Sequence, residues 1–595
     1  MAPIGVEPDG TAVLLSPSAL AELYHLGQYL EAALGGPQDV EFAQDQAGHL
    51  WLVQARPLTQ PVPEVVVYDN ANIQESYCGV TTPLTFSFAQ RAYATVYRQT
   101  MRTLGLPAAT VAAHEPVITN LLALQQGRIY YNLNNWYRGL LLLPNFRQSK
   151  ADMERMMGVL EPVDFVRDQH KTLSQQLAML PRLALNLGRL LGEFARLPQR
   201  VKGFQARFEA EYQRFYQLPL ADLSAAALLR EIEHLDAALL TRWTTPIVND
   251  FRVMMANGAA TRRLTQIGVA DADEFLSRYL AGRPGAPAEA APLASLLPAL
   301  ALRELGRVAR QDFPALLPLL HAPGPALPAQ VARLAPAFHR QVQHYIARYG
   351  DRTMGELKLE TETMRTNETL FYSYLEAYLA PPPAAATASL PTQAAAELAG
   401  LLDPKSWLLA RQVRGSLAAL RAAVARREAL RLERTRLFGM YRAAYRALGQ
   451  RLAAAGSLAT PLDVFWLTET EIRAAAHASG PQWAALAATR QAEFGAYRAA
   501  PAPAGRLVVP SRPVVVAGAA PPADGCLRGT GCYPGEVRGE VVVITDPAQA
   551  AIGAVRGRIV AALRTDPGWA ALFPGCRAVL IERGSALSHS VILLR

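Results

Sequence analysis

The sequence predicts a multidomain, mainly α protein that begins with a short β segment and ends in an α/β domain. Three observations carry this prediction. A chain of 595 residues is too long for one hydrophobic core and indicates about three or four domains. Apolar residues recur at spacings of three and four through most of residues 68–500, which is typical of amphipathic helices. Short apolar runs near both ends favour strands instead.

Composition narrows the class of protein. Apolar residues make up 51% of the chain and charged residues 18%, so sizeable cores can be buried. No apolar run approaches 18 residues and the start lacks a signal peptide, so we expect a cytoplasmic protein that does not enter a membrane. The net charge of +9 is spread over helical segments that also carry glutamates, such as residues 426–442. This pattern is typical of a solvated helix face, and no nucleic-acid partner is expected.

The first 60 residues end in a predicted β-hairpin. Its first strand is DVEFAQD, its turn covers residues 46–49, and its second strand is LWLVQARPL. The period of two places Gln54 and Arg56 on one face of the second strand, where Glu41 of the first strand could join them. Carboxylate and amide oxygens suit magnesium and a guanidinium suits phosphate. An ordinary polar surface hairpin is the alternative.

A proline-rich connector at residues 57–67 separates this segment from a large domain at 68–500, which we expect to be all-helical. A second proline-, alanine- and glycine-rich stretch at 499–525 leads into the C-terminal domain, residues 506–595. Such a compliant linker would allow that last domain to swing.

The C-terminal domain ends in a histidine with the surroundings of an anion site. Residues 576–582 are predicted to form a strand, a small-residue turn follows, and Ser588 can cap a helix that contains His589 in its first turn. Free amides and the helix dipole favour an anion there. A neutral imidazole is also a competent nucleophile. A histidine that merely caps the helix or is satisfied in the core is the alternative.

The residues around His589 resemble the swivelling phosphohistidine domain of the phosphoenolpyruvate-utilising enzymes. The similarity covers TDPGW at 565–569, ERG at 582–584 and LSH at 587–589. It implies that His589 carries a phosphoryl group between two active sites. It further implies supporting roles for a second set of residues, Thr565, Asp566, Arg583, Gly584 and Ser588. Ser585 departs from the glycine usual in the family, and the domain is expected to be incomplete because relatives continue beyond Arg595.

The opening hairpin, GGPQDVEFAQDQAGHLWLVQARPLT, resembles the end of an ATP-grasp nucleotide-binding domain from the same enzymes. The resemblance implies that Glu41 and Gln54 bind Mg²⁺ and that Arg56 binds the phosphates of ATP. Residues 1–60 would then be the C-terminal remnant of that domain. We therefore expect a chain truncated at both ends, or one whose ATP-grasp half is a separately encoded polypeptide.

Three places in the middle domain are candidates for binding an acceptor. Residues 69–86 resemble the entry to the substrate domain of rifampicin phosphotransferases, which directs attention to Asn72, Glu75 and the TPL motif at 82–84. The alternative is structural, with Thr82 capping a helix whose first residue is Pro83. An aromatic and asparagine-rich run at 128–146 could hold a large ligand, although ordinary core packing is favoured.

The third place is the charge-dense segment 348–365. Relatives carry a similar pattern facing the acceptor, although this chain has RTMGE where RGPGE is usual. Arg352 could neutralise a transferring phosphoryl group, and Glu356 could orient or deprotonate an acceptor hydroxyl. The alternative is a solvated surface.

The order of these parts predicts an ATP-dependent, dikinase-type phosphotransferase. A helical region between the ATP-grasp segment and the histidine, with no β/α-barrel pattern, is the order of rifampicin phosphotransferases rather than that of phosphoenolpyruvate synthases. We expect a small acceptor with a hydroxyl group, either pyruvate-like or antibiotic-like. The alternative function is a non-catalytic phosphocarrier or binding fragment without its own ATP site.

Overall fold

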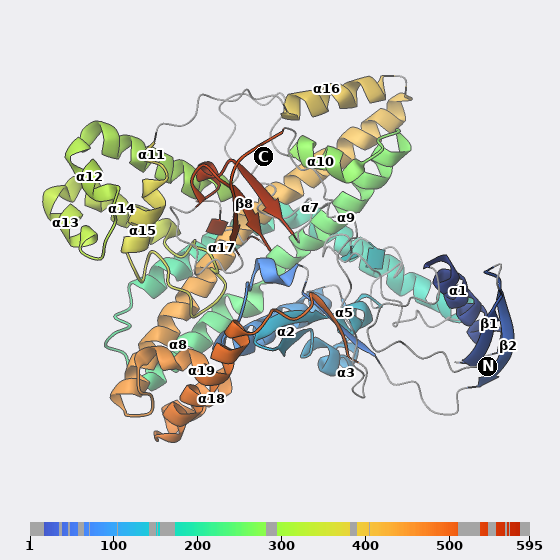
Figure 1. Cartoon of the computed structure of the whole chain (residues 1–595), viewed down its shortest axis with the longest axis horizontal. Helices are drawn as coiled ribbons and strands as arrows, with labels where there is room; N and C mark the ends of the chain where they lie inside the picture. The colour runs from blue at the N-terminus through green and yellow to red at the C-terminus, as the bar shows by residue number, and fades with distance from the viewer. Residues whose placement is uncertain are drawn as a thin grey trace. The chain divides into compact units, whose positions relative to one another are not determined.

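The computed structural model is mainly helical with three small sheets, in keeping with the predicted fold class (Figure 1). The residues it describes are 17–34, 38–45, 48–57, 65–70, 72–103, 105–141, 150–151, 153–154, 173–280, 294–380, 390–403, 405–509, 536–544, 555–563, 565, 568–569 and 572–582. The chain divides into two compact units, and the larger one contains residues 67–507 and the C-terminal residues from 518 onward.

The smaller unit contains the predicted hairpin. Strands β1 (Gln38–Gln44) and β2 (Leu50–Pro57) pair antiparallel, and helix α1 (Pro17–Leu34) packs against both. Glu41 lies opposite Gln54 in the register, and a β-bulge follows Glu41. The hairpin is therefore confirmed.

The larger unit is built around a long helix, α17 (Trp407–Ala454), whose N-cap is Ser406. Helices α7, α8 and α9 pack along it, so much of its circumference is covered. The helices before residue 281 in this unit are α2 (Pro83–Thr103), α3 (Ala108–Ala113), α4 (Glu115–Ile118), α5 (Leu133–Leu140), α7 (Leu173–Tyr216), α8 (Ala225–Ala238), α9 (Thr244–Gln266) and α10 (Ala272–Leu280). The later ones are α11 (Leu297–Asp312), α12 (Leu317–Leu320), α13 (Leu327–Leu334), α14 (Pro336–Tyr349), α15 (Thr369–Glu376), α16 (Leu390–Leu402), α17, α18 (Glu469–His477) and α19 (Gln482–Ala499).

The expectation of an all-helical central domain is wrong in one place. Strands β4 (Leu122–Gln125), β5 (Arg128–Asn132), β3 (Val66–Asp69) and β6 (Arg506–Val509) form a sheet in the order β4-β5-β3-β6. The β4–β5 hairpin turns at Gln126 and Gly127, which both have positive φ. Such a two-residue turn matches the twist of an antiparallel pair, and the aromatic residues of β5 suit a buried strand.

The described part of the C-terminal domain contains the β component of the predicted α/β fold. Strands β7 (Val541–Ile544), β8 (Ile559–Ala562) and β9 (Ala578–Ile581) form a parallel sheet with β8 in the centre. Strand β9 lies within the segment expected to precede the histidine turn.

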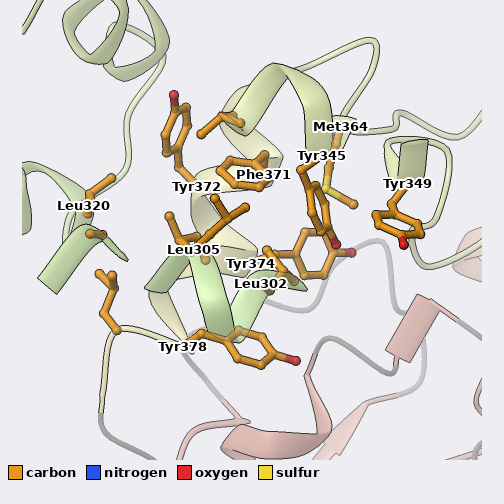
Figure 2. Packing of buried hydrophobic residues seen from close by; sticks show 14 of the residues in the cluster. Leu302, Leu305, Leu320, Tyr345, Tyr349, Met364, Phe371, Tyr372, Tyr374 and Tyr378 are labelled. Carbon is orange, nitrogen blue, oxygen red and sulfur yellow. The ribbon is translucent and has the colours of Figure 1, made fainter. Parts of the chain in front are cut away.

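One apolar core joins this sheet to the helices α11–α15. Its members include Tyr345, Phe371 and Tyr374 from the helices, and Val560 and Trp569 from the C-terminal domain. Figure 2 shows how closely the aromatic rings around α15 pack, and Tyr345 and Phe371 have ring centroids 5.2 Å apart. The C-terminal domain therefore packs against α14 and α15, and the loop between these helices contains the predicted acceptor residues Arg352 and Glu356.

Candidate functional site

The loop between α14 and α15 holds the two charged residues chosen as acceptor candidates. Arg352 and Glu356 are 5% and 1% exposed, and the Nε of Arg352 lies 3.7 Å from the Oε2 of Glu356. Gly355 between them has a φ of +69°, a conformation that favours glycine and turns the chain sharply. The alternative that this charge-dense segment is a solvated surface is therefore wrong, because its central charges are buried.

The loop is fastened to α17 by Arg442, which is 1% exposed. Its guanidinium donates to the carbonyl oxygens of Glu356 at 2.6 Å and Lys358 at 3.1 Å, and it also lies 3.5 Å from Asp351. Burial lowers the pKa of Arg442, while the charge of Asp351 opposes that change. Arg442 therefore shares the charge of Asp351 with Arg365, which lies 3.3 Å from it, and fixes the loop that presents Glu356.

Replacing Arg442 by leucine is expected to lower the melting temperature of the protein by several degrees. The change removes one of the two arginines that pair with the buried Asp351, and it leaves the carbonyl oxygens of Glu356 and Lys358 without this donor, which typically costs about 1–3 kcal/mol for each unsatisfied group. Differential scanning calorimetry measures the effect. Arg414→Leu is the matched control, because Arg414 is an exposed residue of the same helix. Equal melting temperatures for both variants would contradict the role given to Arg442.

The carboxylate of Glu356 has an ion-pair contact with Arg352 but accepts no hydrogen bond in the described part of the protein. Neither of its oxygens has a hydrogen-bond partner among the residues that the structure describes. A buried carboxylate without hydrogen bonds is costly, and such groups usually have a functional or solvent-mediated explanation. This arrangement leaves both oxygens able to accept a proton or a hydrogen bond from a ligand.

The structure brings the second candidate segment, residues 69–86, onto the same loop. The carboxylate of Glu360 accepts hydrogen bonds from the hydroxyls of Thr82 at 3.0 Å and Thr85 at 2.6 Å. Lys358 donates to the carbonyl oxygens of Cys78 and Val80. Helix α2 begins at Pro83 as predicted, although Thr82 bonds to Glu360 rather than acting alone as a cap.

Asn72 and Glu75 lie at the other end of this segment, at the short 3-10 helix Ile73–Glu75. Glu75 is 9% exposed and Asn72 is half-buried. The charge of Glu75 acts on Arg427 of α17, two turns before Thr435. Arg352 donates to the hydroxyl of Thr435 at 3.4 Å. Both candidate segments therefore interact with the same stretch of α17, residues 427–435.

The prediction that residues 426–442 form a solvated helix face is wrong. Glu428, Glu433 and Arg442 are buried there. Several of these charges pair with each other or with other elements, as Arg436 does with Glu433 and with Glu209 of α7. Burial by the neighbouring helices, which sequence spacing alone does not reveal, converts a charged helix face into an interior polar network.

The C-terminal domain contacts the loop through Gly568 of the TDPGW segment identified in the sequence. A Cβ placed on Gly568 would lie 2.1 Å from the carbonyl carbon and oxygen of Thr353. Thr565 and Trp569 are also buried, at 4% and 2% exposure. Only a glycine permits this approach, so the segment next to Arg352 and Glu356 is in direct contact with the domain that contains the predicted carrier.

The remaining catalytic predictions fall outside the described residues. These are His589, Asp566, Arg583, Gly584 and Ser588. Their roles stay predictions.

The opening hairpin provides a donor set of the predicted kind. Glu41 and Gln54 face each other across the strands, and Arg56 follows two residues after Gln54, so all three lie on one side of the pair. All three are exposed. Carboxylate, amide and guanidinium groups in this arrangement fit a magnesium ion and a polyphosphate chemically.

In the described part of the aromatic run at 128–146, core packing explains the side chains, as the sequence favours. The hydroxyl of Tyr130 donates to the carbonyl of Ala504, and that of Tyr137 donates to Glu154. The indole of Trp136 donates to Leu121, and Asn135 donates to Asn120. Internal hydrogen bonds thus satisfy these groups. The ring of Tyr131 instead packs near that of Tyr93, with centroids 6.4 Å apart.

Sequence reasoning missed Arg442, Glu360 and the arginines Arg427, Arg431 and Arg434. Spacings of four and three along a helix place the last three on one face, which is the signal that could have identified them.

Comparison with known proteins confirms the resemblance stated from the sequence. A family model for the fourth domain of rifampicin phosphotransferase matches residues 253–428. A model for the AMP/ATP-binding domain of pyruvate phosphate dikinase matches residues 6–100. The rifampicin phosphotransferase of Streptomyces sviceus is 26% identical over 626 residues, covering 98% of this chain and 64% of that protein.

Uncharacterised proteins of Mycobacterium tuberculosis and Mycobacterium bovis are 32% identical over 336 residues, covering 54% of this chain and 34% of theirs. The chain thus spans about a third of the mycobacterial relatives and less than two thirds of the Streptomyces enzyme. At the level of the family, the matches support ATP-dependent phosphoryl transfer of the kinase type. No helix in the described part of the chain is long and apolar enough to cross a membrane.

Proposed function

We propose that this chain acts in an ATP-dependent phosphotransferase in which His589 carries a phosphoryl group to an acceptor at the loop of Arg352 and Glu356. In the first step a ring nitrogen of His589 attacks a phosphorus atom of ATP, an N–P bond forms, and the P–O bond to the nucleotide breaks. In the second step an acceptor hydroxyl oxygen attacks that phosphorus, the N–P bond breaks, and neutral histidine is restored.

Glu356 and Arg352 have complementary roles in the second step. The hydroxyl proton passes to a carboxylate oxygen of Glu356, neither of which has a hydrogen-bond partner in the described part of the protein. Arg352, 3.7 Å from that carboxylate, stabilises the negative charge on the transferring group. Burial strengthens both effects, because few water molecules compete for these charges.

The opening hairpin would contribute to the first step. Glu41 and Gln54 would hold Mg²⁺, and Arg56 would bind phosphate oxygens of ATP. The ion, when bound, neutralises phosphate charge and orients the nucleotide.

One observation carries the proposal, namely the close packing of Gly568 on Thr353. The domain assigned to the carrier touches the loop assigned to the acceptor, one residue from Arg352. Since transfer between a carrier and an acceptor requires their approach, this contact supports delivery at Arg352 and Glu356.

Gly568→Ala tests this directly. We expect the added methyl group to separate the two surfaces, so that amide hydrogen exchange of residues 350–358 accelerates and phosphoryl transfer falls about 100-fold. Gly575→Ala is the control, because a Cβ there meets nothing within 4 Å. Unchanged exchange and transfer in Gly568→Ala would refute delivery at this loop.

A further inference from the structure

Three arginines occupy one face of α17 next to the proposed acceptor loop. Arg427, Arg431 and Arg434 are spaced by four and three residues, so successive turns of the helix bring them together. All three are half-buried, with side-chain exposures of 18% for Arg427 and 13% for Arg431. Cations held this close, and away from bulk water, repel one another unless an anion lies between them.

Acidic residues engage these arginines only partly. The Nε of Arg427 lies 3.2 Å from Asp250, whereas the NH1 of Arg431 lies 3.6 Å from Glu428. Within the described ranges, the NH1 of Arg431 and the Nε of Arg434 have no hydrogen-bond partner. Burial lowers the pKa of Arg427 and the charge of Arg431 lowers it further, while the charges of Asp250, Glu428 and Glu75 oppose this shift. The guanidinium groups of Arg431 and Arg434 therefore retain donors for an anionic ligand.

Three tyrosines complete the surroundings of Arg434. Burial raises the pKa of Tyr77, Tyr93 and Tyr131, and the charge of Arg434 opposes that rise in each case. The charge of Arg434 thus acts on all three phenols. Since their pKa values lie above neutrality, the tyrosines keep their protons and remain hydrogen-bond donors at physiological pH.

The arginine cluster lies at a defined distance from the acceptor loop. Arg352 contacts Thr435, and Arg442, two turns further on, contacts the backbone at Glu356. The eight residues from Arg434, the nearest of the three arginines, to Arg442 span about 12 Å along a helix. A ligand with its hydroxyl at Glu356 would reach the arginines with a group about two helical turns away.

We propose that Arg427, Arg431 and Arg434 form a binding subsite for a carboxylate or phosphate group of the acceptor, whose nearest arginine lies about 12 Å along α17 from the contact with Glu356. The placement of the acceptor hydroxyl at Glu356 rests on the proposed function. The subsite itself requires only the arginines. Planar guanidinium groups bind such oxyanions through paired N–H donors, which a neutral ligand cannot exploit to the same extent.

Binding to the full chain tests the subsite without ATP. The probe is 10-hydroxydecanoate, which carries an anion at the far end from its hydroxyl, and decane-1,10-diol is its neutral counterpart. By isothermal titration calorimetry we expect the acid to bind at least 10-fold more tightly than the diol, with an affinity that falls as salt is raised. Equal affinities, or no binding of the acid, would overturn the subsite.

Variants locate the anion. The double variant Arg431→Gln/Glu428→Gln removes both partners of one buried pair, so that no buried charge is left alone. It is expected to weaken binding of the acid at least 10-fold and to leave binding of the diol unchanged. Arg414→Gln, an exposed change in the same helix, should have no effect. Wild-type affinity in the double variant would contradict the assignment.

A further variant separates this inference from the proposed function. His589→Ala should bind the acid as the wild type does, because the subsite does not involve the carrier. Binding with no phosphoryl transfer in any assay would refute the proposed function and retain the subsite. Phosphoryl transfer that is indifferent to the arginines would refute the subsite alone.

Discussion

His589→Ala is expected to abolish phosphoryl transfer, with a loss of about four orders of magnitude or more. The physical reason is that the carrier nitrogen is the only proposed bridge between the two reactions, so nothing else in the account can accept the phosphoryl group. The variant should retain the melting temperature of the wild type. Nucleotide turnover is measured with ATP and Mg²⁺, using the chain together with a complete ATP-grasp domain from a rifampicin phosphotransferase.

A matched histidine change serves as the control. His477 is exposed at the end of α18, so His477→Ala should leave turnover unchanged. Turnover that survives in His589→Ala would exclude a carrier role for this residue. Equal turnover by the ATP-grasp domain in the absence of this chain would assign the activity to that domain alone.

Glu356→Gln is expected to lower transfer to the acceptor by about 10²- to 10⁴-fold, the usual contribution of a general base. The amide keeps the shape of the side chain but cannot take the proton. Formation of phosphohistidine should continue, so the phosphorylated form of the chain should accumulate. Rapid-quench measurements distinguish these two steps.

The control for this change is Glu362→Gln in the same loop. Glu362 is exposed, and its amide variant should transfer phosphate at the wild-type rate. A loss of phosphohistidine in Glu356→Gln would place the defect in the first step. Equal transfer rates for both variants would show that Glu356 is not the base.

Local patterns in the sequence predicted several elements correctly. Alternating apolar and polar residues gave the hairpin that pairs Glu41 with Gln54, and the TPL motif placed the start of α2 at Pro83. Both features depend on residues close together in the chain. Strand β9 was also predicted from its short apolar run.

Interactions between distant segments explain what the sequence did not reveal. Arg442 bonds to the carbonyl of Glu356, 86 residues earlier in the chain, and Glu360 bonds to Thr85, 275 residues earlier. Periodicity assigns a charged helix face to solvent because it contains no information about which helices surround it. The charge density of residues 348–365 directed attention to Arg352 and Glu356, whereas their burial and their partners on α17 required the fold.

The most direct test of the carrier is to locate the phosphoryl group on the chain. The protein is incubated with Mg²⁺ and ATP labelled at the β or γ position, in the presence of the supplied ATP-grasp domain, and the labelled peptide is identified by mass spectrometry. Phosphohistidine is acid-labile, so its label should disappear at low pH. We predict acid-labile label on His589 and none on His589→Ala. Label on another residue, acid-stable label, or label that persists in His589→Ala would contradict the account.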